Sequence, residues 1–410
     1  MDFSDTPQEA AFRAEARAFL DANAEPLTGT NAITRGRVAD DVLLQRAAEW
    51  QAKKADAGFA VITWAKEHGG RAGSPIQHVI YGQEEARYAV PRGVYEIGLG
   101  MCVPTVIAHG TPGQVARHVR PAVRGEEIWC QLFSEPAAGS DVAGLRTRAV
   151  KDGEDWVING QKIWTSGAHY ADWGLLLART DPNAAKHAGL TMFVIPMKGP
   201  GVEVRRIKQI AGTSNFNEVF FTDLRVPDTA RVGAVGQGWK VGLTTLMNER
   251  MTIGGSVGVD FDEIFALARD LDTGEGPAIR NAAVRERLAE WYVRSRGLKH
   301  THMRTVTKLS RGERPGPENS IGKLVTASKL QEIASFALDL QGAAGVVMDR
   351  ELAPMRALFQ ESLLSAPGHR IAGGTDEIMK NIIAERVLGL PGDVRVDRDV
   401  PFSAIPTGKR

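Results

Sequence analysis

The spacing of apolar residues changes twice along this chain of 410 residues, and these changes limit the folds that it can adopt. Up to about residue 125, apolar residues recur at the spacing of an amphipathic helix, between breaks at Gly and Pro. From residue 129 to about residue 232, short β-rich runs are bounded by Gly, Asn, Asp or Pro. The helical spacing then returns and continues to about residue 390. The sequence therefore predicts an α+β protein in which one β segment separates two helical segments.

Composition and charge exclude several classes of protein. A chain of this length exceeds one ordinary core, so two or three packed units are expected. The net charge is +1, which leaves no basic surface for nucleic acid or an anionic membrane. The two cysteines, Cys102 and Cys130, have no metal-ligand spacing, so no metal site is expected. The first residues are acidic and no apolar run approaches the roughly 18 residues of a membrane span, so a cytoplasmic enzyme is expected.

Two segments between residues 129 and 167 hold side chains suited to a flat aromatic cofactor. They read Trp129-Cys-Gln-Leu-Phe-Ser-Glu-Pro-Ala-Ala-Gly-Ser-Asp141 and Trp156-Val-Ile-Asn-Gly-Gln-Lys-Ile-Trp-Thr-Ser-Gly167. Trp164 can stack on a ring, and the hydroxyls of Ser134 and Ser166 can donate hydrogen bonds to its edge. Taken singly, Trp164 is equally explained as a core indole and the serines as turn residues, whereas the whole set favours a cofactor site. Asn159-Gly160 is in addition a signal for a hairpin turn.

In this order and at this separation, the two segments resemble the flavin-binding core of the acyl-CoA dehydrogenase family. A third motif near the C-terminus, Arg370-Ile-Ala-Gly-Gly-Thr-Asp-Glu-Ile-Met379, resembles the C-terminal motif of the same family. The resemblance covers roughly residues 5–391. It implies a three-domain architecture with an N-terminal helical domain, a central β-barrel or sheet domain and a C-terminal helical bundle. The implied limits are 1–127 for the N-terminal domain, 128–232 for the middle domain with the flavin and acyl-CoA site, 233–391 for a four-helix bundle and 392–410 for a tail.

The resemblance also implies FAD as the cofactor, bound without a Rossmann motif, because the turn ending at Gly139 lacks the G-x-G-x-x-G pattern. Ser134, preceded by Phe133, matches the hydroxyl residue at the reactive edge of the flavin. Hydrogen-bond donors there stabilise the negative charge that arrives with a hydride. Gly139 and Ser140 match a turn near both flavin and substrate. The residues implied to bind the cofactor are Gln131, Phe133, Ser134, Gly139, Ser140, Trp164, Thr165, Ser166, Thr375 and Glu377.

Oxidation of an acyl thioester to its 2,3-enoyl form needs a base for the α-proton and an acceptor for the β-hydride. A carboxylate that is shielded from water, with a raised pKa, is the natural base. In many acyl-CoA dehydrogenases it is a glutamate just before the Gly-Thr of the C-terminal motif, but Gly373 occupies this position here. Long-chain and isovaleryl-type members carry the glutamate on a helix that opens the C-terminal domain, directly before an arginine. Glu249-Arg250 fits this second arrangement.

Helical spacing supports Glu249 as the base. Its neighbours three and four residues away include the apolar Leu246 and Ile253, so we expect the carboxylate to be partly desolvated and its pKa to be raised. Taken alone, Glu249-Arg250 is more simply explained as an exposed charged pair on a helix. Because Gly373 leaves the usual position of the catalytic glutamate without a carboxylate, we favour Glu249 as the base.

Substrate contacts are expected from the same two motifs. Arg250 is expected to meet a phosphate or carbonyl of the CoA arm, and the backbone N–H of Gly373 to polarise the thioester carbonyl. A loop that requires a positive φ explains Gly373 and Gly374 equally well. The residues expected to contact the substrate are Ser140, Arg250, Gly373 and Gly374.

Two elements of the family are altered in the C-terminal part of the chain. The Arg-x-x-Phe-Gly motif, whose arginine reaches the FAD of a neighbouring subunit in the family, is absent near residues 269–275. The Gln-x-x-Gly-Gly element reads Asp339-Leu-Gln-Gly-Ala343. Both changes weaken the expectation of a standard homotetramer. A homo-oligomer (dimer or tetramer) is still expected, and a heteromer is the alternative.

These residues together predict FAD-dependent α,β-dehydrogenation of an acyl-CoA thioester in lipid β-oxidation, with an electron-transfer flavoprotein as the electron acceptor. An acyl-CoA oxidase or flavin monooxygenase of the same fold is an alternative, because oxygen access cannot be read from a sequence. A non-catalytic subunit of a heteromeric acyl-CoA dehydrogenase is another alternative, because the glutamate of the C-terminal motif is missing. The sequence does not specify the acyl group.

Overall fold

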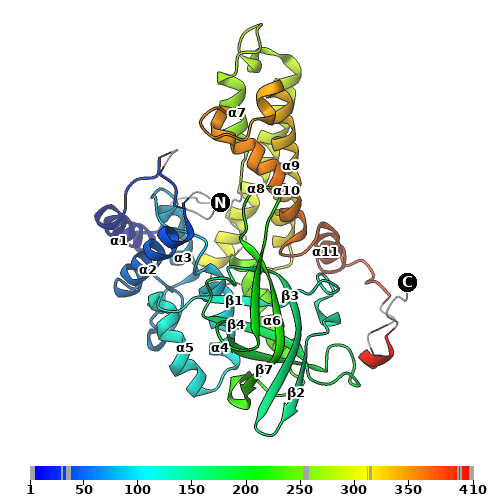
Figure 1. Ribbon diagram of the computed structural model, residues 1–410. Helices are drawn as coiled ribbons and strands as arrows, with labels where there is room; N and C mark the ends of the chain where they lie inside the picture. Colours follow the sequence, from blue (N-terminus) through cyan, green and yellow to red (C-terminus); the bar gives the residue numbers. More distant parts are fainter. Residues whose placement is uncertain are drawn as a thin grey trace. The chain divides into compact units, whose positions relative to one another are not determined.

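The computed structural model describes residues 5–28, 31–33, 38–252, 258–311, 313, 316–394, 397 and 399–405, without the side chains of residues 249–252 and 310. The chain divides into two compact units. The first unit comprises residues 1–209, 213–252 and 394–410, and the second comprises residues 210–212 and 253–393. The order of elements is helical, then β, then helical, which confirms the predicted α+β class (Figure 1). None of the described helices is long and apolar enough to cross a membrane.

Helices form the N-terminal part of the first unit. They are α1 (Pro7–Asn23), α2 (Asp40–Asp56), α3 (Pro75–Glu85), α4 (Val103–His109) and α5 (Pro112–Arg124). α1 begins at a capping box, in which Thr6 accepts a hydrogen bond from the backbone of Glu9 and the Glu9 side chain accepts one from the backbone of Thr6. Phe12, Ala16 and Leu20 recur every four residues and form the stripe that α1 buries.

The middle of the chain forms an eight-stranded sheet in the order β6-β7-β3-β2-β4-β5-β8, with β1 paired to β4. The strands are β1 (Trp129–Leu132), β2 (Arg148–Asp152), β3 (Asp155–Ser166), β4 (Trp173–Arg179), β5 (Leu190–Pro196), β6 (Val202–Ile207), β7 (Phe216–Pro227) and β8 (Arg231–Val232). β4 runs parallel to β1 and β2, and the other pairs are antiparallel. The short β-rich runs of the sequence thus become the strands of one sheet.

The predicted hairpin at Asn159-Gly160 is wrong, because both residues lie inside β3. Gly160 has a φ of 152° and pairs with Phe221 directly after a shift in register. A Cβ at this position would lie 2.6 Å from the Cα of Thr147. The glycine therefore permits a close approach of two backbone segments rather than a turn.

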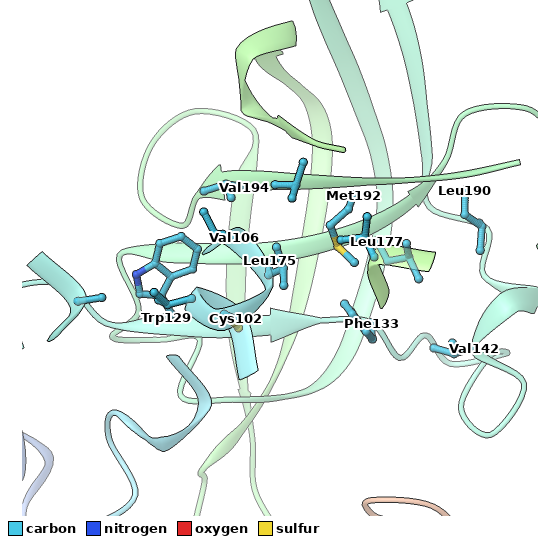
Figure 2. Packing of buried hydrophobic residues seen from close by; sticks show 14 of the residues in the cluster. Cys102, Val106, Trp129, Phe133, Val142, Leu175, Leu177, Leu190, Met192 and Val194 are labelled. Atoms are coloured by element: carbon cyan, nitrogen blue, oxygen red, sulfur yellow. The ribbon is translucent and has the colours of Figure 1, made fainter. Parts of the chain in front are cut away.

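β4 separates two hydrophobic cores of the first unit. Leu175 and Leu177 belong to a core that β4 shares with residues of α4, α5 and α6 (Gly238–Thr252). Figure 2 shows Leu175 and Leu177 in this core together with Val106 of α4. Leu176 and Ala178 belong to the core on the opposite face. This alternation follows the two-residue period of a strand. One face of the sheet therefore packs against helices, and α6 is one of them.

The second unit is helical. Its helices are α7 (Phe261–Asp270), α8 (Ala282–Ser310), α9 (Asn319–Gln341), α10 (Leu358–Ile371) and α11 (Asp376–Ile382). Trp291, Ile333 and Phe359 are fully buried in its core. Lys329 of α9 is also buried, where it forms an ion pair with Asp260, the N-cap residue of α7, and a hydrogen bond with α8. One buried cation therefore joins three helices.

Candidate active site

A β-bulge in β3 presents the indole of Trp164 on the surface of the first unit. The pairing of β3 with β7 passes from Lys162–Val219 to Thr165–Asn217, so β3 carries one extra residue. Trp164 has a φ of 59° and is 56% exposed. A left-handed backbone at such a residue costs about 1–3 kcal/mol, and bulges often re-aim side chains beside functional sites. The geometry leaves the indole free to stack on a planar ligand.

The next residue, Thr165, is buried, and its hydroxyl has no hydrogen-bond partner among the described residues. Its backbone is held in place, because the buried amide of Asn217 donates to the Thr165 carbonyl over 2.9 Å. A buried hydroxyl without a partner costs about 1–3 kcal/mol. An exposed indole directly before such a hydroxyl fits a flat aromatic group with hydrogen-bond acceptors along its edge. These residues therefore fit a flavin ring.

A buried ion pair connects the end of β1 to β3. Lys162 is 0% exposed, and its ammonium group lies 2.8 Å from Glu135 Oε1 and donates to the carbonyl of Phe133 over 3.0 Å. Burial lowers the pKa of Lys162 to about 8, although Glu135 opposes this shift. Burial raises the pKa of Glu135, but the attraction of Lys162 and the hydrogen bonds that Glu135 accepts outweigh it, so this pKa is lowered. Glu135 is therefore held as a carboxylate.

This ion pair fixes the position of Ser134, which lies between Phe133 and Glu135. The carbonyl of Ser134 accepts a hydrogen bond of 2.9 Å from the backbone N–H of Ile163, the residue before Trp164. The structure thus brings the backbone of Ser134 beside the bulge that carries Trp164. Lys162 and Glu135 were not singled out in the sequence, although Lys162 is in phase along β3 with the buried residues Trp156 and Ile158.

The turn with Gly139 and Ser140 is exposed. The residues that follow it, a short 3-10 turn at Val142–Gly144, are held by Arg179 of β4. The Arg179 guanidinium donates to the carbonyls of Ala143 and Leu145 over 2.6 and 3.2 Å. The remaining predicted residues of this unit, Gln131 in β1 and Ser166 at the end of β3, are half-buried.

α6 packs against Phe133 and α4. A Cβ at Gly242 would lie 3.8 Å from the ring of Phe133, so this part of α6 lies directly against that ring. Thr245 is fully buried, and its hydroxyl lies 2.9 Å from the hydroxyl of Thr105 in α4. Glu249 and Arg250 are in the last turns of α6, but their side chains lie outside the described residues.

The other predicted residues belong to the second unit. Gly373 and Gly374 form the turn between α10 and α11 with φ values of 65° and 97°, which favour glycine. Lys323 of α9 donates to the carbonyl of Gly374 and, over 3.3 Å, to that of Arg370. The chain after residue 370 is therefore fastened to α9.

Thr375 and Glu377 begin α11. Thr375 is its N-cap residue, with its hydroxyl accepting from the backbone of Ile378 over 3.2 Å. Glu377 is exposed in the first turn, and hydrogen bonds from its own backbone N–H and from Thr375 lower its pKa. Both residues line a cavity of about 290 Å³ that includes Gln331 and Arg370.

Three family models match the chain in sequence order. They describe the N-terminal, middle and C-terminal domains of acyl-CoA dehydrogenase and match residues 6–126, 130–224 and 236–388. Acyl-CoA dehydrogenase IpdE1 of Mycobacterium tuberculosis is 38% identical over 393 residues, which cover 94% of this chain and 98% of that protein. Acyl-CoA dehydrogenase FadE34 of the same organism is 39% identical over 343 residues, or 83% of this chain. The match spans 46% of the length of FadE34.

Solved structures share the whole architecture. A structure described as the Tcur3481-Tcur3483 steroid ACAD has a TM-score of 0.78 and 26% identity, and the match covers 96% of this chain and 100% of that one. The ChsE4-ChsE5 complex from Mycobacterium tuberculosis has a TM-score of 0.76 and 27% identity, again over 96% and 100% of the two chains. The predicted sequence of helical, sheet and helical parts is therefore confirmed.

Proposed function

Because the chain belongs to the acyl-CoA dehydrogenase family, we propose that it converts an acyl-CoA thioester to the 2,3-enoyl-CoA, with Glu249 as the base. The relatives that are 37–39% identical are named acyl-CoA dehydrogenases, which does not favour an oxidase, a monooxygenase or a non-catalytic subunit. FAD is the cofactor of this family and, when bound, supplies the acceptor for the β-hydride.

The bulge of β3 and the loop after β1 are proposed to hold the flavin. Trp164 supplies the stacking surface, and Ser134, Thr165 and Ser166 supply hydrogen-bond donors for the edge of the ring. The unpartnered buried hydroxyl of Thr165 and the exposed indole beside it support this assignment. Donors that are in place before the reaction stabilise negative charge without further reorganisation.

The position of Glu249 in α6 supports its role as the base. Glu249 follows Thr245 by four residues, and helical periodicity places residues at this spacing on one face. Thr245 and Val241, the preceding members of this row, are 0% and 1% exposed. We propose that the Glu249 carboxylate continues this row, because a carboxylate that is shielded from water is suited to remove an α-proton. The burial of Thr245 one turn before Glu249 is the observation that carries this assignment.

The substrate contacts are proposed to come from both motifs of the sequence. Arg250 binds a phosphate or carbonyl of the CoA arm, and Ser140 contacts the thioester region from its exposed turn. The backbone N–H of Gly373 polarises the thioester carbonyl. Two observations support this role, because they fix the direction of the backbone groups. Gly373 and Gly374 have positive φ values, and Lys323 donates a hydrogen bond to the Gly374 carbonyl.

We propose that the acyl group carries alicyclic rings. The description of one solved relative names a steroid, and two more distant relatives are named cyclohexane-1-carbonyl-CoA dehydrogenase. A base on a helix, rather than in the loop at Gly373, is compatible with such a bulky group. We therefore expect a steroid side-chain CoA thioester to reduce the flavin of the unmodified enzyme faster than octanoyl-CoA does under anaerobic conditions.

The electrons are proposed to pass to an electron-transfer flavoprotein, within a β-oxidation sequence. A second chain of the same family is proposed to complete the assembly, with a homo-oligomer as the alternative. Two solved relatives are described by pairs of names, and FadE34 is about twice as long as the segment that matches this chain. These observations support a pair of family chains acting together.

Replacement of the proposed base tests the mechanism. In Glu249→Gln, we expect FAD to stay bound, while anaerobic flavin reduction by an acyl-CoA substrate slows by at least about 10²-fold, the lower range for loss of a general base. Stopped-flow bleaching of the flavin absorbance measures this rate.

Glu286→Gln serves as the matched control, because Glu286 is exposed on α8. This variant should reduce its flavin at the rate of the unmodified enzyme. An undiminished rate in Glu249→Gln would remove Glu249 from the role of the base.

A further inference from the structure

The C-terminal segment returns to the first unit and binds along the loop between β4 and β5. Pro401 forms an antiparallel bridge with Ala185. Within the same loop, the backbone N–H of Phe402 donates to the carbonyl of Ala184 over 3.0 Å, and that of Ser403 donates to the carbonyl of Pro182 over 2.8 Å. The segment that the sequence predicts only as a tail is thus paired with the sheet unit through its backbone.

The ring of Phe402 covers the guanidinium group of Arg179. The distance from Arg179 Cζ to the ring centroid is 3.5 Å. Arg179 is buried, and burial lowers its pKa to about 10. This is the same cation that donates to the carbonyls of Ala143 and Leu145, directly after the candidate flavin turn. Phe402 of the tail therefore covers the Arg179 guanidinium group, which holds the residues directly after the candidate flavin turn.

A second cation connects the tail to the turn itself. Lys186 is 6% exposed and forms ion pairs with Asp141, over 2.6 Å, and with Asp397 of the tail. Hydrogen bonds to these two carboxylates outweigh burial and raise the pKa of Lys186. Asp141 directly follows Gly139 and Ser140. A cation shared between tail and turn therefore links the two segments.

The turn has little packing of its own. Gly139 and Ser140 are exposed, and no atom of the described residues would lie within 4 Å of a Cβ at Gly139. On the side before the turn, Ala138 is buried and pairs with Glu135 through two backbone hydrogen bonds. On the other side, Lys186 holds Asp141 and Arg179 holds the residues after it. The tail contacts both cations, because Asp397 pairs with Lys186 and Phe402 covers Arg179.

We propose that Asp397 and residues 401–405 act as a strap that positions the Gly139–Asp141 turn for the flavin and the acyl-CoA, through Lys186 and Arg179. This inference rests on the proposed function of the turn. Asp397 and Phe402 are positioning residues in this arrangement, because they act on the turn through the two cations. The strap should affect binding more than the chemical step, since Glu249 belongs to a different element, α6.

Hydrogen exchange of the FAD-loaded protein tests the strap without relying on turnover. In Asp397→Asn and Phe402→Ala, we expect the amides of residues 139–145 to exchange about tenfold faster, while α1 to α5 exchange as before. In steady state, the KM for acyl-CoA should rise about tenfold with kcat changed less than about threefold. Phe402→Trp, which keeps an aromatic face over Arg179, should restore both values.

Asp399→Asn is the control for the charge change, because Asp399 is an exposed tail residue. It should exchange and turn over like the unmodified enzyme. Unchanged exchange at 139–145 in Phe402→Ala would overturn the strap, as would faster exchange spread over the whole unit. An unmodified enzyme that no acyl-CoA reduces would overturn the proposed function instead, and the exchange data would still decide on the strap.

Discussion

Two adjacent residues, Trp164 and Thr165, each adopt an arrangement that is unfavourable without a ligand. Trp164 has a left-handed backbone and is 56% exposed. Thr165 buries a hydroxyl that has no partner among the described residues. Each feature costs about 1–3 kcal/mol. A flat ring with acceptors at its edge would cover the indole and pair with the hydroxyl, so FAD bound as proposed would offset both costs.

Trp164→Ala is expected to weaken FAD binding roughly tenfold, because it removes a stacked pair worth about 1.5 kcal/mol. The fold should be retained, since the side chain lies on the surface. The flavin-to-protein ratio after dialysis measures the effect. Trp164→Phe keeps an aromatic face and should hold most of its flavin. An unchanged ratio in Trp164→Ala would show that the indole does not stack on the cofactor.

The sequence could single out Trp164, Ser134 and Thr165 as candidates because their chemistry is distinctive within short motifs. It could not identify Lys162 and Glu135 as a pair, since each resembles an ordinary surface charge and they are 27 residues apart. Only the pairing of the strands brings them together. Helical spacing predicted α6 and the position of Glu249 within it, because that pattern is local.

At the scale of elements, β3 contributes most to the site. Its pairing with β7 is irregular twice, once at Gly160 and once before Thr165. The first irregularity explains the wrong hairpin prediction, because Asn-Gly satisfies a turn and a close backbone approach equally well. The second creates the bulge that presents Trp164. Both depend on residues of distant strands, so local patterns predicted the strand but neither of its irregularities.

The buried ion pair between Lys162 of β3 and Glu135, which follows β1, leads to a prediction for the stability of a Lys162 variant. Lys162→Met leaves Glu135 buried without its cation, which should lower the free energy of unfolding by about 3 kcal/mol or more. The double variant Lys162→Met/Glu135→Gln should recover more than half of this loss, because no unpaired charge remains. Urea denaturation of the apoprotein measures both values.

Lys208→Met is the control for this pair, because Lys208 is exposed, and it should stay within about 0.5 kcal/mol of the unmodified protein. If Lys162→Met were equally stable, the ion pair would not fasten the loop that carries Ser134.

At the scale of the whole molecule, the division into two units does not follow the change of apolar spacing. α6 is helical but belongs to the first unit, and so does the segment after residue 393. The spacing of apolar residues shows where helices give way to strands. Which elements pack into one unit depends instead on contacts between residues that are far apart in the sequence. The domain limits at residues 127, 232 and 391 therefore remain predictions. The tail could not be placed from sequence, because its anchors, Lys186 and Arg179, are more than 200 residues away.

The altered motifs of the second unit lead to a prediction for the assembly. The chain lacks Arg-x-x-Phe-Gly, and Asp339 replaces the first Gln of Gln-x-x-Gly-Gly. In the family, the arginine of Arg-x-x-Phe-Gly reaches the FAD of a neighbouring subunit, so a homo-oligomer of this chain should hold its cofactor weakly. We therefore expect the chain alone to retain less than one FAD per protomer.

Co-expression with a family chain of the source organism that carries Arg-x-x-Phe-Gly tests this prediction. The two chains should purify together in a 1:1 ratio, and the FAD site of this chain should be filled more completely than in the chain alone, because the cofactor that this chain binds would gain a neighbour with the missing arginine. Light scattering with absorbance detection measures mass and flavin together. A chain that forms a homotetramer by itself, with one FAD in each protomer, would contradict the heteromer, since its own residues would then complete every cofactor site.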